Sequence, residues 1–371
     1  MRVLYVYKDY YPVLGGIEGH IRILAEGLAA RGIAVQVLVT NTERHTVTEE
    51  IGGVSVTKAA RLGTLSSAPL SLELVRRIGD FQPDIAHLHF PYPVGELATL
   101  WRGRARRLVV TYHSDIVRQK YLGWAYGPFV RRLLDRANAV IVSNPTFLRN
   151  SPFVAAQAQK TVVIPFGQKL ATFEPTVQSR ARAQEIRAEY GERIALFVGK
   201  LRYYKGVANL ITAMCEVNPS VQTLIAGSGP METAWKALAQ AKGVGGRVHF
   251  VGRITARELP AYFQAAKMFV LPSSHPSETF GIVQSEAMAS GLPCICTELG
   301  TGTSYVNQHG ITGLVVPSRD PHALAIAINM LDDNEPERLK MARAALARAR
   351  AEFSHTVMID RTMKLYERLL S

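Results

Sequence analysis

The chain has 371 residues, of which 47% are hydrophobic and 20% charged, and its formal net charge is +13. These values describe a globular protein of two ordinary domains. No apolar run approaches the roughly 20 residues that cross a bilayer, and the N-terminus does not read as a signal peptide. Cys215, Cys294 and Cys296 predict neither a disulfide framework nor a zinc site, so we expect a reduced, cytoplasmic protein.

Short apolar strands alternate with helices through the first half of the chain. A helix follows Gly16 and ends at Gly32, and others are predicted at 71–81 and 118–136. The predicted strands are 2–7, 34–40, 54–58, 84–89, 108–112, 139–143 and 161–164. This alternation predicts a parallel, doubly wound α/β sheet.

Residues 165–180 show no clear period and carry Gly167 and Pro175, which predicts a connection between domains. The alternation then restarts, with strands predicted at 194–198, 221–226, 248–251, 268–271, 292–297 and 313–316. Helices are predicted from 205, from 230, and at 256–266, 280–290, 321–331, 336–352 and 356–370. Two Rossmann-like halves in tandem are expected, with the ligand in the cleft where the carboxyl ends of their strands face each other.

Two glutamates flank the start of the helix predicted at 280–290: Glu278 in the preceding loop and Glu286 two turns in. A helix N-terminus after a strand favours anions because its first N–H groups are unpaired. Glu278 would then lie beside a bound phosphate, and Glu286 could accept hydrogen bonds from ribose hydroxyls. Phosphate together with a polyol indicates a sugar nucleotide, although two glutamates at this spacing also fit an ordinary helix surface.

The whole string of residues 274–293 resembles the E-x7-E element of retaining GT-B glycosyltransferases of the GT4 type. The resemblance implies that Glu278 positions the donor sugar as a catalytic residue and that Glu286 binds the nucleoside. It also implies that the backbone of Phe280, Gly281 and Ile282 binds the donor diphosphate.

A GT-B fold places two Rossmann-like domains across a cleft, with the last helix crossing back to the first domain. We expect an acceptor-binding domain at 1–170, joined by 355–371, and a donor-binding domain at 171–354.

Gly15 and Gly16 stand at a predicted helix start, where the absence of side chains lets the backbone approach a ligand. A plain tight turn would fit as well, and the absence of G-x-G-x-x-G disfavours a dinucleotide dehydrogenase. The loop resembles the P-x-x-G-G loop that GT4 enzymes bring to the donor diphosphate and sugar.

His113 follows a strand that ends at the expected ligand edge, where a structural histidine is an equal alternative. GT4 proteins commonly place a histidine here beside the donor sugar, which implies a catalytic role. His87 and His89 face one side of their strand but lack a third ligand, so no metal site is predicted. By position alone, the acceptor-side residues are assigned as Asp115, Arg118 and Lys120.

Three cations in the loop 198–206 predict a clamp for the diphosphate leaving group. Lys205 matches the lysine of the GT4 pattern G-R-x4-K-G, whereas Lys200 replaces the usual arginine and Arg202 follows two residues later. Which of these two supplies the second cation stays open, because a lysine cannot reproduce the arginine fork. Two further loops resemble those that lie beside the nucleoside in GT4 enzymes. They contain Gly227, Ser228, Val251 and Arg253.

The positive charge fits diphosphate substrates, anionic lipid or nucleic acid. Basic residues gather at 101–107, 118–120 and 131–132 and in the arginine-rich C-terminal helices, without the motifs of sequence-specific nucleic-acid binding. Either solvated faces or membrane attraction explains them. We hypothesise that 102–107, together with 122–126 beside 118–120, docks on anionic membrane.

The segments 5–12, 111–115, 202–206 and 300–304 resemble bacterial mannosyl- and D-rhamnosyltransferases of O-antigen and exopolysaccharide assembly. The resemblance implies transfer from GDP-mannose to a polyprenyl-diphosphate-linked sugar, without metal or other cofactor, at the inner face of the cell membrane. GDP-rhamnose or a UDP-sugar is the alternative donor. A GT-B epimerase or phosphorylase, or a basic nucleic-acid-binding protein, is a more distant alternative.

Overall fold

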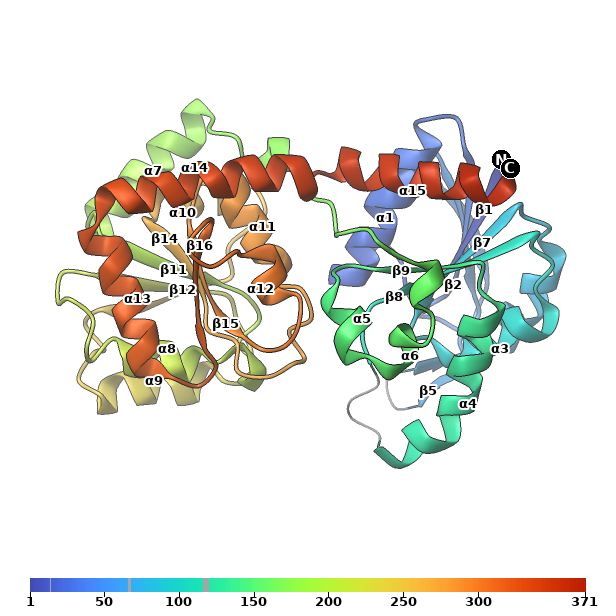
Figure 1. The fold of residues 1–371 in the computed structure, drawn as a ribbon, viewed down its shortest axis with the longest axis horizontal. Coiled ribbons are helices and arrows are strands. Elements are labelled where there is room, and N and C mark those ends of the chain that lie inside the picture. The colour runs from blue at the N-terminus through green and yellow to red at the C-terminus, as the bar shows by residue number, and fades with distance from the viewer. Residues whose placement is uncertain (14, 66–67, 116–119) are drawn as a thin grey trace. The chain divides into compact units, whose positions relative to one another are not determined.

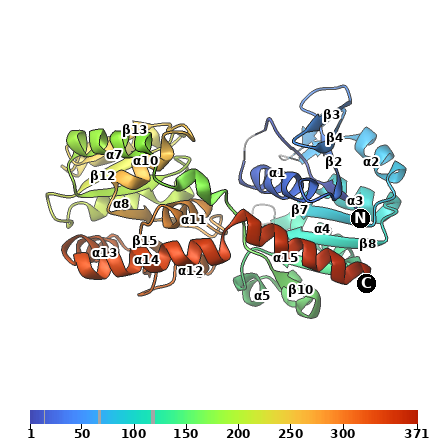
Figure 2. The ribbon, with the colours of Figure 1, turned by 90° about the horizontal axis from the view of Figure 1, so that it is seen from above.

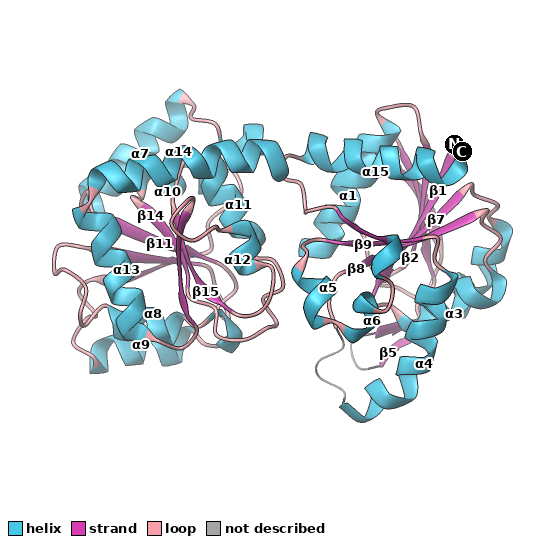
Figure 3. Cartoon of the chain, in the orientation of Figure 1, coloured by secondary structure: helices cyan, strands magenta, loops and turns pink. Residues whose placement is uncertain are grey.

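The computed structural model describes residues 1–13, 15–65, 68–115 and 120–371. The chain divides into two compact units, one formed by Met1–Gly167 with His355–Ser371 and the other by Gln168–Ser354. Each unit is a sheet with helices packed on it (Figure 1 and Figure 3). The last helix, α15 (His355–Leu370), belongs to the first unit, as the GT-B resemblance implies.

In the part of the chain that the structure describes, the first unit holds an eight-stranded sheet in the order β10-β9-β8-β7-β1-β2-β4-β3. Its strands are β1 (Arg2–Val6), β2 (Ala34–Thr40), β3 (Val47–Ile51), β4 (Val54–Ala59), β7 (Ile85–Phe90), β8 (Arg107–Tyr112), β9 (Ala139–Val142) and β10 (Thr161–Val163). The sheet is parallel as predicted except at one edge, where the unpredicted strand β3 runs antiparallel to β4. The turn between them is Gly52-Gly53, and both glycines have the positive φ that a two-residue hairpin requires.

The helices of this unit are α1 (Gly16–Ala29), α2 (Leu72–Arg77), α3 (Pro93–Arg102), α4 (Lys120–Arg136), α5 (Thr146–Asn150), α6 (Pro152–Ala155) and α15, and β5 (Gly63–Leu65) pairs with β6 (Ala68–Leu70). The helix α15 lies beside α1 (Figure 2). An added Cβ at Gly27 would lie 2.2 Å from Ile359 Cδ1, and Arg31 pairs with Asp360 at 2.6 Å. The small residue therefore lets the two helices pack closely.

The second unit contains, within the described residues, six parallel strands in the order β13-β12-β11-β14-β15-β16. They are β11 (Ile194–Val198), β12 (Gln222–Ala226), β13 (Val248–Gly252), β14 (Met268–Leu271), β15 (Cys294–Glu298) and β16 (Gly313–Pro317). Numbered within the unit, the order is 3-2-1-4-5-6, which is that of the doubly wound dinucleotide-binding fold. The direction of strand order reverses between β11 and β14, and ligands bind at such a point in this class of sheet.

The helices of this unit are α7 (Val177–Tyr190), α8 (Val207–Ala213), α9 (Glu232–Ala241), α10 (Leu259–Ala265), α11 (Ile282–Ala289), α12 (Thr303–Val306), α13 (Pro321–Asp333) and α14 (Glu335–Glu352). The expected connection at 165–180 is too long, because α7 already begins at Val177. Thr176 and Ser179 form a capping box that starts this helix. Among the described residues, no helix has the length and apolar character to cross a membrane.

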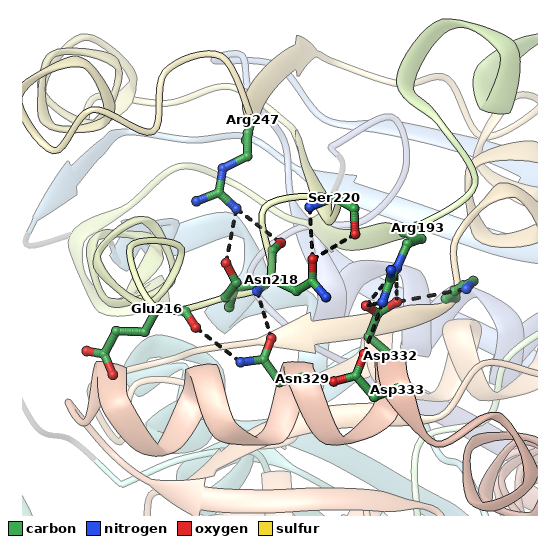
Figure 4. Close-up of polar contacts among 10 residues, drawn as sticks. Arg193, Glu216, Asn218, Ser220, Arg247, Asn329, Asp332 and Asp333 are labelled. Atoms are coloured by element: carbon green, nitrogen blue, oxygen red, sulfur yellow. Dashed lines mark hydrogen bonds and ion pairs between the residues drawn. The ribbon is translucent and has the colours of Figure 1, made fainter.

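A polar network joins α13 to β11 and to the connection before β12 (Figure 4). The Asp332 carboxylate is fully buried and accepts two hydrogen bonds from Arg193 Nε, at 2.8 and 3.0 Å. The neighbouring Asp333 accepts one from Arg193 Nη2 at 3.0 Å but is 61% exposed. The two aspartates thus share one cation in different dielectric environments.

We expect Asp332→Ala to destabilise the protein by about 2–3 kcal/mol, because it removes the buried partner of Arg193 and leaves only the exposed Asp333. Asp333→Ala is the matched control and should cost at most about 0.5–1 kcal/mol, since an exposed pair is screened by water. Urea unfolding of the two variants measures the difference. Equal losses would contradict the assignment of the pairing energy to the buried aspartate.

Candidate active site

The loops after β11, β12 and β13 are tied together by backbone hydrogen bonds. Gly199 N donates to Ala226 O at 2.9 Å, and Gly227 N donates to Gly252 O at 2.7 Å. An added Cβ at Gly227 would lie 1.9 Å from Gly199 O. The structure therefore brings the predicted nucleotide-binding loops at 199–202, 227–229 and 251–253 into one cluster.

Within this cluster, several predicted nucleotide-binding groups are accessible. Ser228 and Arg253 are exposed, and Gly227 and Val251 are partly exposed. Ser228 O accepts a hydrogen bond from Leu201 N at 3.0 Å, so its loop is held against the predicted diphosphate loop.

The loop that carries Lys205 packs directly on the loop that leads to Glu278. Gly206 has a φ of +65°, and an added Cβ there would lie 1.9 Å from Pro272 O. Ser274 N also donates to Tyr204 O at 2.8 Å. No other residue type fits at position 206 without moving one of the two loops.

Lys205 and Glu278, predicted separately as a diphosphate ligand and a catalytic residue, form an ion pair. Lys205 Nζ lies 2.5 Å from Glu278 Oε2, and the residues are only 8% and 9% exposed. Ser273 Oγ donates to the same carboxylate at 3.3 Å. A diphosphate at Lys205 would compete for the cation and leave the carboxylate available to sugar hydroxyls.

Lys200 and Arg202 extend from the same loop and are both exposed. Arg202 N donates to Lys200 O at 2.8 Å, so the two residues belong to one tight turn. Either side chain can reach an anion from this turn, and the choice between them stays a prediction.

The helix α11 begins at Ile282, two residues later than predicted, because Gly281 has a φ of +75° and serves as the N-cap. An added Cβ at Gly281 would lie 2.7 Å from Gln284 Nε2 and 2.8 Å from Leu271 Cδ2. Phe280 is buried beneath the turn. The first N–H groups of an α-helix have no partner within the helix, so the predicted anion site keeps its physical basis.

Glu286 lies little more than one turn into α11, rather than the two turns predicted. The residue is partly exposed, but burial of its carboxyl group raises the pKa to about 7. A carboxylate that has lost its water is stabilised when ligand hydroxyls donate hydrogen bonds to it.

In the first unit, Gly15 caps α1 in an extended conformation and Gly16 is the first helical residue, as predicted. Both are exposed. An added Cβ at Gly15 would lie 2.1 Å from Glu18 Oε2, so the carboxylate of the first turn folds back over this glycine. A side chain at position 15 would displace only the flexible end of Glu18, so the glycine leaves the backbone uncovered rather than being required by the turn.

His113 follows β8 and is part of a cluster of four buried histidines among the described residues. The members of this histidine cluster are His20, His87, His89 and His113. His89 Nδ1 and His113 Nε2 are 2.9 Å apart, within hydrogen-bond distance. Burial lowers the pKa of His20 to about 4 and that of His87 to about 3, and it holds the pKa values of the other two well below the usual range. All four rings are therefore neutral at pH 7.

Sequence reasoning assigned no role to His20 or His89. His20 shares the buried face of α1 with Ile21 and Leu24, and this helical spacing could have placed it inward. The alternation of His87 and His89 did predict that both face the same side, and their rings are stacked at 4.6 Å. In the ranges that the structure covers, no group of three or more His, Cys, Asp or Glu residues could hold a metal ion.

The predicted acceptor-side residues are only partly described. Asp115 Oδ1 accepts hydrogen bonds from Tyr112 Oη at 2.6 Å and from Ser151 Oγ at 2.7 Å, which fixes its position. Arg118 lies outside the described residues. Lys120 is the first residue of α4, and its side chain is likewise outside them.

Two family models match the chain. The model for glycosyl transferases group 1 matches residues 179–348, and that for glycosyltransferase family 4 matches residues 14–167. The chain belongs to the GT4 glycosyltransferases. This family assignment favours sugar transfer over the epimerase, phosphorylase and nucleic-acid-binding alternatives.

This glycosyltransferase is similar to relatives along its whole length. It is 36% identical to the O-antigen chain mannosyltransferase C of Escherichia coli, over 100% of this chain and 99% of that protein. It is also 36% identical to the D-rhamnosyltransferase WbpZ of Pseudomonas aeruginosa, over 95% and 92% of the two chains. Among solved structures, Anabaena Alr3699/HepE in complex with UDP matches with a TM-score of 0.80 and 19% identity, over 99% of this chain and 100% of that chain. That structural match supports the GT-B fold.

The raised pKa of Glu286 predicts a pH-dependent stability difference in this glycosyltransferase. An unfolded glutamate titrates near 4.5 and the folded one near 7, so the native state binds more protons between these values. The native carboxyl group therefore favours folding below about pH 4.5, and this contribution is lost as the pH rises through 7. Glu286→Gln should be more stable than wild type by about 1–3 kcal/mol at pH 8 and equal to it at pH 4.5.

Urea unfolding at the two pH values measures this difference. The control is Glu185→Gln, which alters a 63% exposed glutamate of the same unit and should behave alike at both pH values. A Glu286→Gln variant that is less stable than wild type at pH 8 would show that the ionised carboxyl group does not destabilise the native state.

Proposed function

We propose that this enzyme is a retaining glycosyltransferase that transfers an α-mannosyl group from GDP-mannose to a polyprenyl-diphosphate-linked sugar during bacterial surface polysaccharide assembly. The observation that carries the proposal is the whole-length match, at 36% identity, to an O-antigen chain mannosyltransferase. The second candidate donor is GDP-rhamnose, because the D-rhamnosyltransferase relative is equally identical.

The charged groups of the second unit suit a departing nucleoside diphosphate. Negative charge grows on the diphosphate as the glycosidic bond breaks, and preorganised cations and N–H groups lower the barrier where that charge develops. We assign this role to Lys205, to Lys200 or Arg202, and to the α11 N-terminus at Phe280, Gly281 and Ile282. Since these groups already supply positive charge, we expect transfer without a metal ion.

The remaining donor contacts follow from the same assignment. Glu278 accepts hydrogen bonds from the donor sugar, and Glu286 accepts them from the ribose. The loops containing Gly227, Ser228, Val251 and Arg253 hold the nucleoside. In the first unit, Gly15 and Gly16 approach the diphosphate and His113 contacts the sugar, while Asp115, Arg118 and Lys120 remain candidates for the acceptor side. We accordingly assign donor binding to residues 171–354 and acceptor binding to residues 1–170 with 355–371.

Wild-type enzyme should transfer mannose from GDP-mannose to a GlcNAc-diphosphate-lipid acceptor in the presence of EDTA. A panel of GDP-, UDP- and dTDP-sugars measures donor choice, and the anomeric configuration of the product is read by NMR. Transfer from GDP-rhamnose instead would establish the second candidate. Absence of binding to any of the nucleotides would contradict the proposal.

The variant Glu278→Gln tests the role of this glutamate in the same assay. This variant keeps the side-chain shape but removes the charge that faces Lys205, and kcat should fall at least about 100-fold at a temperature where the variant is folded. The exposed-site variant Glu185→Gln should keep wild-type turnover. Wild-type turnover in Glu278→Gln would remove this glutamate from the reaction.

We further propose that the enzyme works peripherally at the inner membrane face, because its acceptor carries a lipid. The C-terminal end of α3 and the residues after it present an exposed basic segment with Arg102 and Arg104 exposed and Trp101 80% exposed. Arginines next to a tryptophan suit an anionic lipid surface, since the cations meet headgroups and the indole fits the interface.

The double substitution Arg102→Ser/Arg104→Ser should weaken binding to anionic vesicles about 10- to 30-fold at low salt, since each basic residue near the surface adds about 1 kcal/mol. Co-sedimentation with phosphatidylglycerol-containing liposomes measures it. The matched control is Arg343→Ser/Arg350→Ser, which removes the same charge from exposed positions on α14. Equal weakening by both pairs would show that net charge, rather than this segment, is responsible.

A further inference from the structure

The histidine cluster contains more hydrogen-bonding capacity than its own contacts use. Among the described residues, three of its ring nitrogens are buried without a partner: His20 Nδ1, His89 Nε2 and His113 Nδ1. A buried polar group left unpaired costs about 1–3 kcal/mol. Three such nitrogens in one cluster are unusual and call for an explanation other than packing.

Three histidines of the cluster form two hydrogen-bonded groups, one containing His87 and the other containing His89 and His113. His87 Nδ1 contacts Tyr366 Oη at 2.5 Å and His87 Nε2 contacts Thr111 Oγ1 at 2.6 Å, so both nitrogens of this ring are used. Tyr366 Oη also lies 2.9 Å from Tyr5 Oη. The second group is the pair His89 and His113, and each of these rings keeps one nitrogen without a protein partner.

The position of the His113 ring is set by stacking on both sides. The ring of His89 lies 5.2 Å away at 16°, and that of Phe166 lies 5.5 Å away at 29°. Stacking restrains the ring plane but does not determine which nitrogen points toward His89. The hydrogen bond between His89 Nδ1 and His113 Nε2 does.

The same hydrogen bond couples the tautomers of the two rings. Each neutral imidazole has one N–H and one acceptor nitrogen, so a proton on His89 Nδ1 requires an acceptor at His113 Nε2 and an N–H at His113 Nδ1. A proton on His113 Nε2 requires the reverse arrangement. Either way, the state of His113 Nδ1 follows from that of His89.

We propose that His89 is a positioning residue that holds His113 in one rotamer and one tautomer, so that His113 Nδ1 is presented to a hydroxyl group of the donor sugar. The sugar contact rests on the proposed function, whereas the coupling of the two rings does not. His89 acts through His113 and contacts no reacting atom itself.

Paired substitutions separate positioning from packing. His89→Leu fills similar space without a hydrogen bond and should lower kcat about 10- to 100-fold with little change in the KM for the sugar nucleotide. His89→Asn places an amide near the former Nδ1 and should restore kcat to within a few-fold of wild type. The comparison variant is His87→Leu, because His87 is equally buried and stacks on His89 but makes no hydrogen bond to His89 or His113. This variant should lower the unfolding temperature and leave His113 in a single tautomer.

The tautomer is read independently of transfer. In protein labelled with ¹⁵N-histidine, the His113 ring nitrogens should show a single neutral tautomer in wild type and His89→Asn, and a mixture in His89→Leu. A single unchanged tautomer in His89→Leu, or wild-type kcat in that variant, would overturn the inference. If wild type transfers no sugar at all, the proposed function fails while the NMR comparison still tests the coupling.

Discussion

The buried ion pair between Lys205 and Glu278 is the constraint on which the second unit depends. Two opposite charges on side chains that are each 11% exposed lose most of their hydration, and their attraction offsets this cost only when the geometry is held closely. The structure holds it by packing two loop backbones against each other at Gly206 and Pro272. Glycine at position 206, with its positive φ, therefore maintains the ion-pair geometry, because any Cβ there would separate the two loops.

A pair of this kind also prepares the site for its ligand. Removing one partner of a buried pair typically costs about 3–5 kcal/mol, so neither charge is tolerated alone. Under the proposed function, an anionic diphosphate would replace Glu278 as the partner of Lys205, and sugar hydroxyls would replace Lys205 as the partner of Glu278. Ligand binding would then exchange one set of charge-assisted hydrogen bonds for another without leaving an unpaired charge.

Much of this arrangement is predictable from sequence, where the local pattern is strong. The strand predicted at 268–271 has those bounds in β14, and the glutamates, glycines and Lys205 could be located by motif. The failures have physical causes. The helix α7 buries only Ser179, Ala183 and Ile186, so its apolar period is too weak to detect. The edge strand β3 has an exposed Thr-Glu-Glu centre with little apolar content.

The contacts within the candidate site are a different matter. The spacing of motifs located Lys205 and Glu278 separately, but their contact depends on how the loops after β11 and β14 pack, which no local pattern encodes. The histidine cluster was missed for the same reason. His20 lies on a helix, His87 and His89 on one strand and His113 after another, so only the tertiary fold brings them together.

The two units contain two different electrostatic environments. The second unit supplies cations and N–H groups, which suit the negative charge that grows on the diphosphate. The histidine cluster of the first unit is neutral, because burial lowers the pKa values of all four rings. A glycosyl group gains positive charge as its bond to the leaving group breaks, and a protonated imidazole beside it would oppose that change. Under the proposed function, a neutral His113 beside a sugar hydroxyl would therefore add no repulsion in the transition state.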